Sequence, residues 1–282
     1  DLISTAWHWL LKNHPHDDIY GCGIDQVHDE MNYRFEQAQQ IGEIIVRDSL
    51  RQVAREADFS SQDGMPVIVF NPLNWDRHEM VFGNIDFDFD DPLADGFKLV
   101  DQQGKVIPVQ VLQDEETFWM ETLKANRKRR LEIAFPADVP ACGYTGYYVQ
   151  PISNEDEEPT PASAWSIGKE GAENRYLSFQ IAPDGGLTIH DKVMDITYEG
   201  LNHFEDVDDA GDEYSYCLCV NSQTISPRGL TASIELVTEG VNLAEYEVKW
   251  DFQIPVSLKE DRRSRSTELV SMMIRSRISL YR

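Results

Sequence analysis

The sequence predicts an α+β multidomain chain, with part of a helical bundle followed by antiparallel β-sandwich domains. Apolar residues recur at steps of three and four up to about residue 56, and from residue 66 onward the pattern alternates with period two. An acidic, proline-bearing stretch, SNEDEEPTPA, interrupts the β region and has the composition of a linker. We therefore expect a bundle part over 1–62, a small β domain over 63–152, a linker over 153–162, and the first part of a large β-sandwich over 163–282.

Two helices account for the first region. Residues 3–12 place Ile3 and Trp7 on one face, and Pro15 disfavours helix in the residue before it. A longer amphipathic helix follows, with Gly23 expected as its N-cap, and it ends in the polar run ADFSSQDG. Two helices that meet at a short junction are typical of a bundle.

The β region is read from alternating runs separated by turn residues. Hairpin turns are expected at DQQG and at PDGG. The expected strands are VIVFN, MVFGNIDF, FKLVDQQGKVIPVQVLQ with its internal turn, RLEIAF, TGYYVQP, LSFQIAPDGGLTIHDK with its internal turn, YSYCLCV, LTASIELV, LAEYEVKWDF and ELVSMMIRSRISLYR.

Composition excludes several classes of partner. The chain carries 50 acidic and 25 basic residues, a net charge of -25, which argues against nucleic acid or an anionic membrane as partner. No apolar run approaches the roughly 18 residues of a membrane span. The 4 cysteines form no CxxC pair, so we expect a reducing cytoplasm. The chain begins with Asp1 rather than Met, and apolar residues follow at once with helical spacing, so we expect it to be a piece of a longer polypeptide.

The junction between the helices, NHPHDDIYGCG, holds an unusual cluster in HPHDD, residues 14–18. Imidazole and carboxylate groups are ligands that zinc accepts, so His14, His16, Asp17 and Asp18 are candidates for a metal-binding or sugar-binding corner. The alternative is an exposed turn in which an aspartate caps the next helix. One segment supplies too few ligands, so a complete site would need others from elsewhere.

Three further features have open interpretations. The negative charge of the acidic run EDVDDAGDEY, residues 205–214, is expected to be compensated by a cation, a sugar or solvent. The spacing of its carboxylates does not match an EF-hand. The basic run KANRKRR, residues 124–130, predicts a solvated hairpin or a partner for acidic loops. Cys217 and Cys219 are expected to pack on one face of a strand.

Three segments resemble a known family. NHPHDDIYGCGIDQVHDEMNYRFEQAQQ resembles the bundle junction of glycoside hydrolase family 38, the α-mannosidases and mannosylglycerate hydrolases. VFNPLNWDR resembles the strand that opens the first β domain of that family, and GLTIHDK followed by DAGDEY resembles the start of its large β-sandwich. The three segments occur in the family order and together span most of the chain.

The resemblance implies a function and a set of site residues. The family holds one zinc ion between an N-terminal α/β barrel and a bundle histidine, and His16 matches that histidine. Asp17 matches an aspartate that contacts sugar hydroxyls, and Tyr214 matches an aromatic that reaches the substrate from the sandwich. The nucleophile and the acid of this retaining α-mannosidase mechanism belong to the barrel, so no catalytic residue is expected here and these residues alone should be inactive.

The implied partners are an α-mannoside and the protein's own barrel domain, and whether the parent is a homodimer stays open. Asp18 and Tyr20 depart from the family, which usually has serine or alanine at the first position and cysteine or threonine at the second. An additional carboxylate at Asp18 would add negative charge near the zinc. The alternative function is a non-catalytic carbohydrate-binding or structural β-sandwich module, and a pure interaction scaffold is a third.

Overall fold

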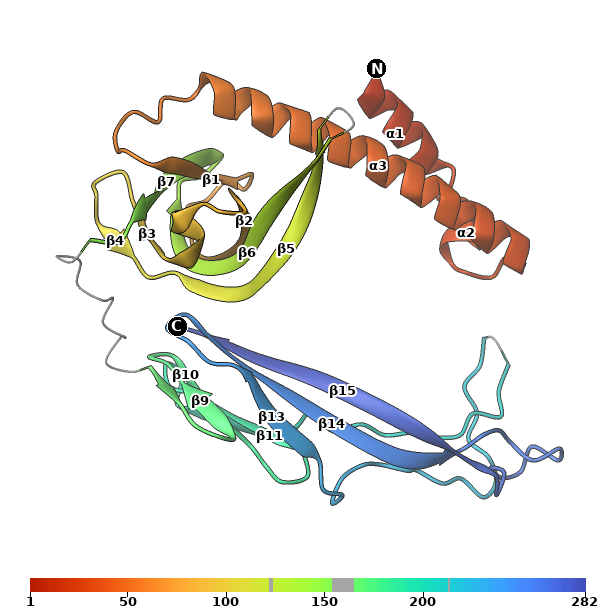
Figure 1. Ribbon diagram of the computed structural model, residues 1–282. Helices are drawn as coiled ribbons and strands as arrows, with labels where there is room; N and C mark the ends of the chain where they lie inside the picture. The colour runs from red at the N-terminus through yellow and green to blue at the C-terminus, as the bar shows by residue number, and fades with distance from the viewer. Residues whose placement is uncertain (122–123, 154–164, 213) are drawn as a thin grey trace. The chain divides into compact units, whose positions relative to one another are not determined.

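The computed structural model describes residues 1–121, 124–153, 165–212 and 214–282 (Figure 1). Of the expected linker over 153–162, all but Ser153 lies outside the described residues. The chain divides into two compact units, Asp1–Gln62 and Asp63–Arg282. The first unit is helical and the second consists of antiparallel sheets, which confirms the predicted α+β class.

The helical unit contains α1 (Leu2–Leu11), the single turn α2 (His16–Ile19) and the long α3 (Asp25–Glu56). α1 packs along α3, where Trp9 meets Tyr33 edge to face with ring centroids 5.8 Å apart. Asn13 is fully buried, and its side-chain amide donates to the carbonyl of Met31 at 2.9 Å. This bond fixes the end of α1 against α3 and so sets the position of the HPHDD corner.

The HPHDD junction contains the exposed single helical turn α2, which begins at His16. One local expectation for this unit was wrong. The N-cap of α3 is Ile24 rather than Gly23, and no side chain caps it. Close to this helix start, Nε2 of His28 lies 3.1 Å from the carbonyl oxygen of Gly23. No helix in the described part of the chain is long and apolar enough to cross a membrane.

The first half of the second unit is a pair of facing antiparallel sheets. One sheet has the order β1-β7-β3-β4 and the other has the order β2-β6-β5. Their strands are β1 (Met65–Asn71), β7 (Gly143–Pro151), β3 (Phe97–Val100), β4 (Val106–Ile107), β2 (Arg77–Asp88), β6 (Lys124–Val139) and β5 (Gln110–Glu121), with a 3-10 turn over Pro92–Asp95. The expected DQQG turn joins β3 to β4, where the carboxylate of Asp101 accepts from the backbone N–H groups of Gln103 and Lys105.

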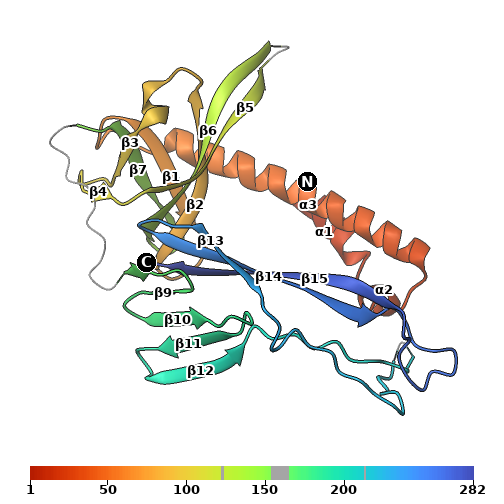
Figure 2. The same ribbon diagram turned by 60° about the horizontal axis from the view of Figure 1, so that its bottom comes forward.

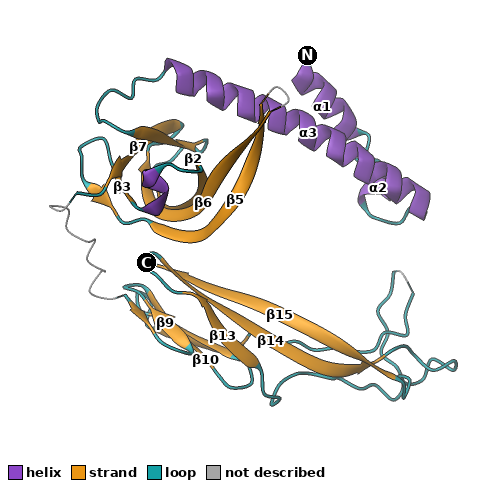
Figure 3. Cartoon of the chain, in the orientation of Figure 1, coloured by secondary structure: helices purple, strands orange, loops and turns teal. Residues whose placement is uncertain are grey.

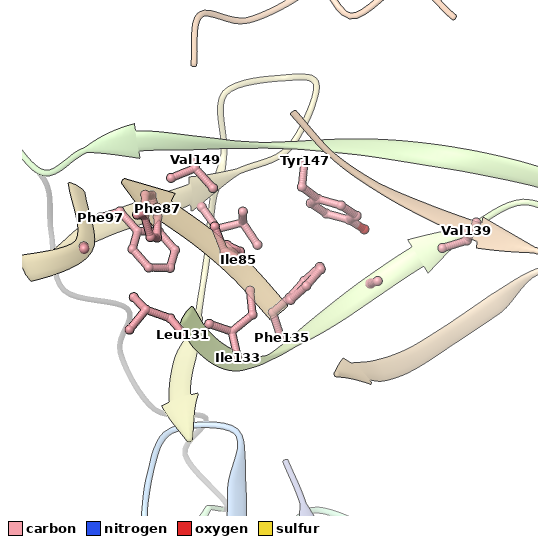
Figure 4. Close-up of a cluster of buried hydrophobic side chains, with 12 residues drawn as sticks. Ile85, Phe87, Phe97, Leu131, Ile133, Phe135, Val139, Tyr147 and Val149 are labelled. Atoms are coloured by element: carbon pink, nitrogen blue, oxygen red, sulfur yellow. The ribbon is translucent and has the colours of Figure 1, made fainter. Parts of the chain in front are cut away.

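A continuous apolar core lies between these two sheets (Figure 4). Tyr147 and Val149 project from β7 toward Ile133 and Phe135 of β6, and Tyr147 meets Phe135 at 5.1 Å between ring centroids. Both faces of β7 and β6 are covered here, because Tyr148 and Ala134, which lie between these residues in the sequence, are also buried.

The second half of the unit contains two further antiparallel sheets (Figure 2). Their orders are β12-β11-β10-β9-β8 and β13-β14-β15. The strands are β8 (Ser166–Ile167), β9 (Gly171–Glu173), β10 (Leu177–Ile181), β11 (Leu187–Asp191), β12 (Ile196–Leu201), β13 (Ser233–Thr238), β14 (Leu243–Pro255) and β15 (Leu269–Tyr281). Tyr246 and Trp250 of β14 lie at the centre of a second core with Phe179 of β10. The PDGG turn joins β10 to β11 as expected.

Two buried amide side chains join the two halves of the second unit. Oε1 of Gln110 accepts from the backbone N–H groups of Asn242 and Leu243, at 3.0 and 2.9 Å. Nε2 of Gln110 donates to the carbonyl of Leu243, so this side chain bonds the start of β14 as a neighbouring strand would. The side-chain amide of Asn242 donates in return to the carbonyls of Pro108 and Ala134.

Candidate functional site

The HPHDD corner is built on α2, where Pro15 occupies the N-cap position. Nδ1 of His16 lies 3.0 Å from Oδ1 of Asp17, and both side chains are 78% exposed. An ionised carboxylate only accepts hydrogen bonds, so Nδ1 of His16 carries a proton and donates the hydrogen bond to Asp17. This tautomer leaves the lone pair of His16 on Nε2, which has no hydrogen-bond partner among the described residues.

The electrostatics of Asp17 follow from the same contact. The hydrogen bond from His16, and then the positive charge that this ring carries when it is protonated, lower the pKa of the Asp17 carboxyl below its ordinary value. The Sγ of Cys22 adds a weaker contact at 3.8 Å from Oδ1 of Asp17. Asp17 is therefore an anionic acceptor beside an imidazole, a pair that can bind a cation or a hydroxyl-rich ligand.

Asp18 points away from this pair, toward α3, and its expected effect on a bound zinc ion stays a prediction. Its side chain is only 19% exposed and lies 3.8 Å from the guanidinium of Arg34 on α3. Arg34 also pairs with Glu30 at 2.7 Å. Asp18 therefore faces Arg34 on α3, a cation that it shares with Glu30, while His16 and Asp17 face solvent.

Two neighbours of His16 and Asp17 were missed in the sequence. The ring of Tyr20 stacks on the ring of His16, with centroids 4.8 Å apart and an interplanar angle of 18°. Cys22 contacts Asp17 because Gly21, at a positive φ of 75°, turns the chain back toward α2. The spacing of four between His16 and Tyr20 was the available signal, since residues i and i+4 share a helix face.

No group of three or more histidine, cysteine, aspartate or glutamate side chains in the described residues is arranged to hold a metal ion. The four cysteines are free thiols, and only Cys219 is buried. His16 and Asp17 thus fit a contribution to a metal site but do not form one by themselves.

The acidic run of residues 205–214 lies in the other unit, in the stretch between β12 and β13 that Figure 3 draws as loop. Its aspartates mainly accept backbone hydrogen bonds. Asp208 accepts from Cys219 and Gln223, and Asp209 accepts from Gly211 and Cys217. A cation, a sugar or solvent was expected as the partner of these carboxylates, but the structure shows backbone N–H groups in that role.

The expected strand YSYCLCV is absent from the described residues for the same reason. The backbone N–H groups of Cys217 and Cys219 bond to aspartate side chains instead of a neighbouring strand. Cys217 is exposed while Cys219 is buried, so the two thiols do not pack together on one face. Tyr214 is 84% exposed, and its backbone N–H donates to Asp212.

Lowering the pH is expected to loosen this loop at Asp208. The pKa of Asp208 is about 2 in the folded chain, below the ordinary 3.8, chiefly because the backbone N–H of Cys219 donates to it. A carboxyl with a lowered folded pKa stabilises the fold above its unfolded pKa, and this contribution is lost as the pH falls from about 4 toward 2. The protection of the Cys219 and Gln223 amides against hydrogen exchange, relative to the unfolded chain at the same pH, should fall over that range.

Asp208→Asn provides the test at neutral pH. The N–H of Cys219 bonds to Oδ1 of Asp208 and that of Gln223 bonds to Oδ2, and asparagine replaces one of these oxygens by an NH₂ group, which cannot accept. Exchange at Cys219 or Gln223 should already be faster at pH 7 than in the unmodified chain, while Tyr246 in the core of β14 should be unaffected. Unchanged exchange at both loop positions would contradict the role assigned to Asp208.

The basic run of residues 124–130 lies on β6 and is paired with carboxylates of the flanking strands and the turn that follows β2. Side chains of β2 and β5 lie on either side of it in register. The pairs are Arg127 with Glu116, Lys128 with Asp88, Arg129 with Asp114 and Asp95, and Arg130 with Asp86. The run begins the second strand of the β5–β6 hairpin, and its partners are these carboxylates rather than those of the acidic loop of residues 205–214.

Comparison with known proteins extends this description. No protein-family model matches the chain. A curated protein of Halalkalibacterium halodurans, which carries the name of a mannosylglycerate hydrolase, is 25% identical over 96% of the chain. A solved structure of a protein in glycosyl hydrolase family 38 from Enterococcus faecalis covers the whole chain with a TM-score of 0.85 and 24% identity. The resemblance to glycoside hydrolase family 38 is confirmed.

A second family 38 likeness is an α-mannosidase structure from Enterococcus faecalis V583, with a TM-score of 0.79 and 23% identity over the whole chain. The two solved structures show the same fold. The chain spans 33% of the length of the curated relative and 37% and 36% of the two solved chains. The roles that family 38 implies for His16, Asp17 and Tyr214 stay predictions.

Proposed function

We propose that this chain is part of a cytoplasmic, zinc-dependent retaining α-mannosidase that hydrolyses terminal α-mannosides. His16 supplies one zinc ligand, and Asp17 and Tyr214 contact the sugar. The remaining zinc ligands, the nucleophile and the general acid belong to a barrel domain outside these 282 residues. The family 38 likeness supports the hydrolase class.

The observation that carries the proposal is the bond between Nδ1 of His16 and Asp17, at 3.0 Å. Histidines that bind metals usually donate their other ring N–H to a carboxylate or a carbonyl, which fixes the tautomer and raises the basicity of the ligating nitrogen. His16 has this arrangement and directs an exposed, unprotonated Nε2 away from Asp17. The donor set therefore fits one position of a zinc site.

The chemistry divides between the metal and the chain's own residues. Bound zinc supplies positive charge that orients sugar hydroxyls. Asp17 keeps Oδ2 as a second acceptor for a hydroxyl of the sugar, since its contacts with His16 and Cys22 both use Oδ1. This carboxyl is ionised at neutral pH, and the contact with His16 lowers its pKa further below the ordinary 3.8.

The test compares the full-length parent with its His16→Ala and His14→Ala variants. His14 is the control because it is an exposed histidine two residues away on the same segment. His16→Ala should lose zinc, measured by elemental analysis, and its hydrolysis of p-nitrophenyl α-mannoside and of mannosylglycerate should fall by more than about 100-fold. His14→Ala should keep both properties.

The same comparison separates the alternative function. If the His16→Ala variant keeps its zinc and its turnover, His16 has a structural role and the metal assignment fails. If the parent neither binds zinc nor cleaves either substrate, the non-catalytic carbohydrate-binding or structural module becomes the better interpretation.

A further inference from the structure

We propose that Tyr20 is a positioning residue for His16, and that stacking of the two rings holds Nε2 in the orientation that a metal ion requires. This inference rests on the proposed function, because it concerns the same histidine. It assigns a role to a position at which the chain departs from the usual cysteine or threonine of the resembled family. Tyr20 acts through His16 and is not expected to touch the metal.

The backbone brings the two rings together. The N–H of Tyr20 donates to the carbonyl of His16 at 3.1 Å, which closes the helical turn between them. Side chains four residues apart on a helix lie on the same face. The rings are nearly parallel, at 18°, with centroids 4.8 Å apart, within the range of offset aromatic stacking.

Two contacts restrain the imidazole in different ways. The bond from Nδ1 to Asp17 fixes one edge of the ring, and the stack on Tyr20 restricts rotation of the ring plane. An exposed histidine without such contacts samples several rotamers, and a metal would have to offset that loss of side-chain entropy on binding. With both contacts present, the free Nε2 is already ordered before the metal arrives.

The rest of the turn holds Asp17 in the same way. Gly21 adopts a positive φ of 75°, and the N–H of Cys22 then donates to the carbonyl of Asp17 at 3.2 Å. The Sγ of Cys22 lies 3.7 Å from that carbonyl oxygen and 3.8 Å from Oδ1 of Asp17. The segment from Tyr20 to Cys22 thus contacts both members of the His16 and Asp17 pair.

Tyr20 contributes nothing to a buried core, because it is 77% exposed. Removing its ring should therefore leave α2 and α3 folded. An effect of such a variant on metal binding would consequently report the contact with His16 rather than a loss of structure.

The experiment measures zinc affinity of the full-length parent by competition with a chelator, and checks folding by circular dichroism. Tyr20→Ala should weaken zinc binding by about 10-fold, as the loss of an orienting neighbour does at other metal sites. Tyr20→Phe keeps the ring and should restore the affinity to within about twofold. Ile19→Ala is the matched control, because Ile19 is an exposed apolar residue of the same turn.

Three results would overturn the inference: unchanged zinc affinity in Tyr20→Ala, failure of Tyr20→Phe to restore it, or an equal loss in Ile19→Ala. His16→Ala separates this inference from the proposed function. If His16→Ala loses zinc while Tyr20→Ala does not, only the role of Tyr20 is wrong. If His16→Ala keeps its zinc, the proposed metal role of His16 is wrong as well.

Discussion

Gly185→Ala is expected to lower the free energy of unfolding by about 4 kcal/mol, from backbone strain and overpacking together. Gly185 has a positive φ of 81° in the turn between β10 and β11. A Cβ atom there would lie 2.1 Å from Cζ2 of Trp250, deep inside van der Waals contact. Trp250 is 2% exposed and its indole N–H donates to the carbonyl of Asp184, so the ring has no space to move.

Gly229→Ala separates the two causes. Gly229 has nearly the same φ, 82°, but a Cβ at this position would have no neighbour within 4 Å. It should cost only the backbone strain, about 1 to 2 kcal/mol. Urea denaturation of the chain, followed by tryptophan fluorescence, measures both variants. Equal destabilisation by the two variants would show that overpacking against Trp250 does not contribute to the effect of Gly185→Ala.

Gln110→Ala is expected to lower the free energy of unfolding of the second unit by about 3 kcal/mol. The substitution leaves the N–H groups of Asn242 and Leu243, and the carbonyl of Leu243, without the partner they have in Gln110. Asn242 is 0% exposed, so water cannot replace the lost bonds without rearrangement. Hydrogen exchange of the Leu243 amide should accelerate in parallel with the shift of the urea midpoint.

Gln113→Ala is the control for this prediction. Gln113 lies on the same strand and is exposed, and its side-chain amide donates to the exposed Glu115. A surface substitution of this kind should change stability by less than about 0.5 kcal/mol. If Gln110→Ala were as mild as Gln113→Ala, the halves of the second unit would be held together by their apolar contacts instead.

The helices and most strands could be predicted because their signals are local. The alternation along β14 predicts which side chains face the core, and Tyr246, Val248 and Trp250 are buried in agreement with it. The turns at DQQG and PDGG were predictable from their residue types, since aspartate and glycine favour the required backbone conformations. The contact between His16 and Asp17 follows from their adjacency in the sequence, whereas the roles predicted for them rest on the family resemblance.

The predictions for YSYCLCV and for residues 124–130 were incomplete because a backbone or side-chain group can bond to a partner far away in the sequence. Apolar alternation in YSYCLCV predicted a strand, but the backbone N–H of Cys219 donates to the carboxylate of Asp208, 11 residues earlier, instead of to a neighbouring strand. The cations of residues 124–130 were compatible with a solvated hairpin, and their pairing followed from strand register.

The sequence alone thus determined the fold class, most of the elements, the two hairpin turns and the adjacent pair His16 and Asp17, because backbone preference and burial pattern act over a few residues. The tertiary structure decided that Asp18 turns to Arg34, that Tyr20 stacks on His16, and that Gln110 bonds Asn242 across 132 residues. Such pairings depend on which segments the fold brings together, and no local pattern encodes that choice.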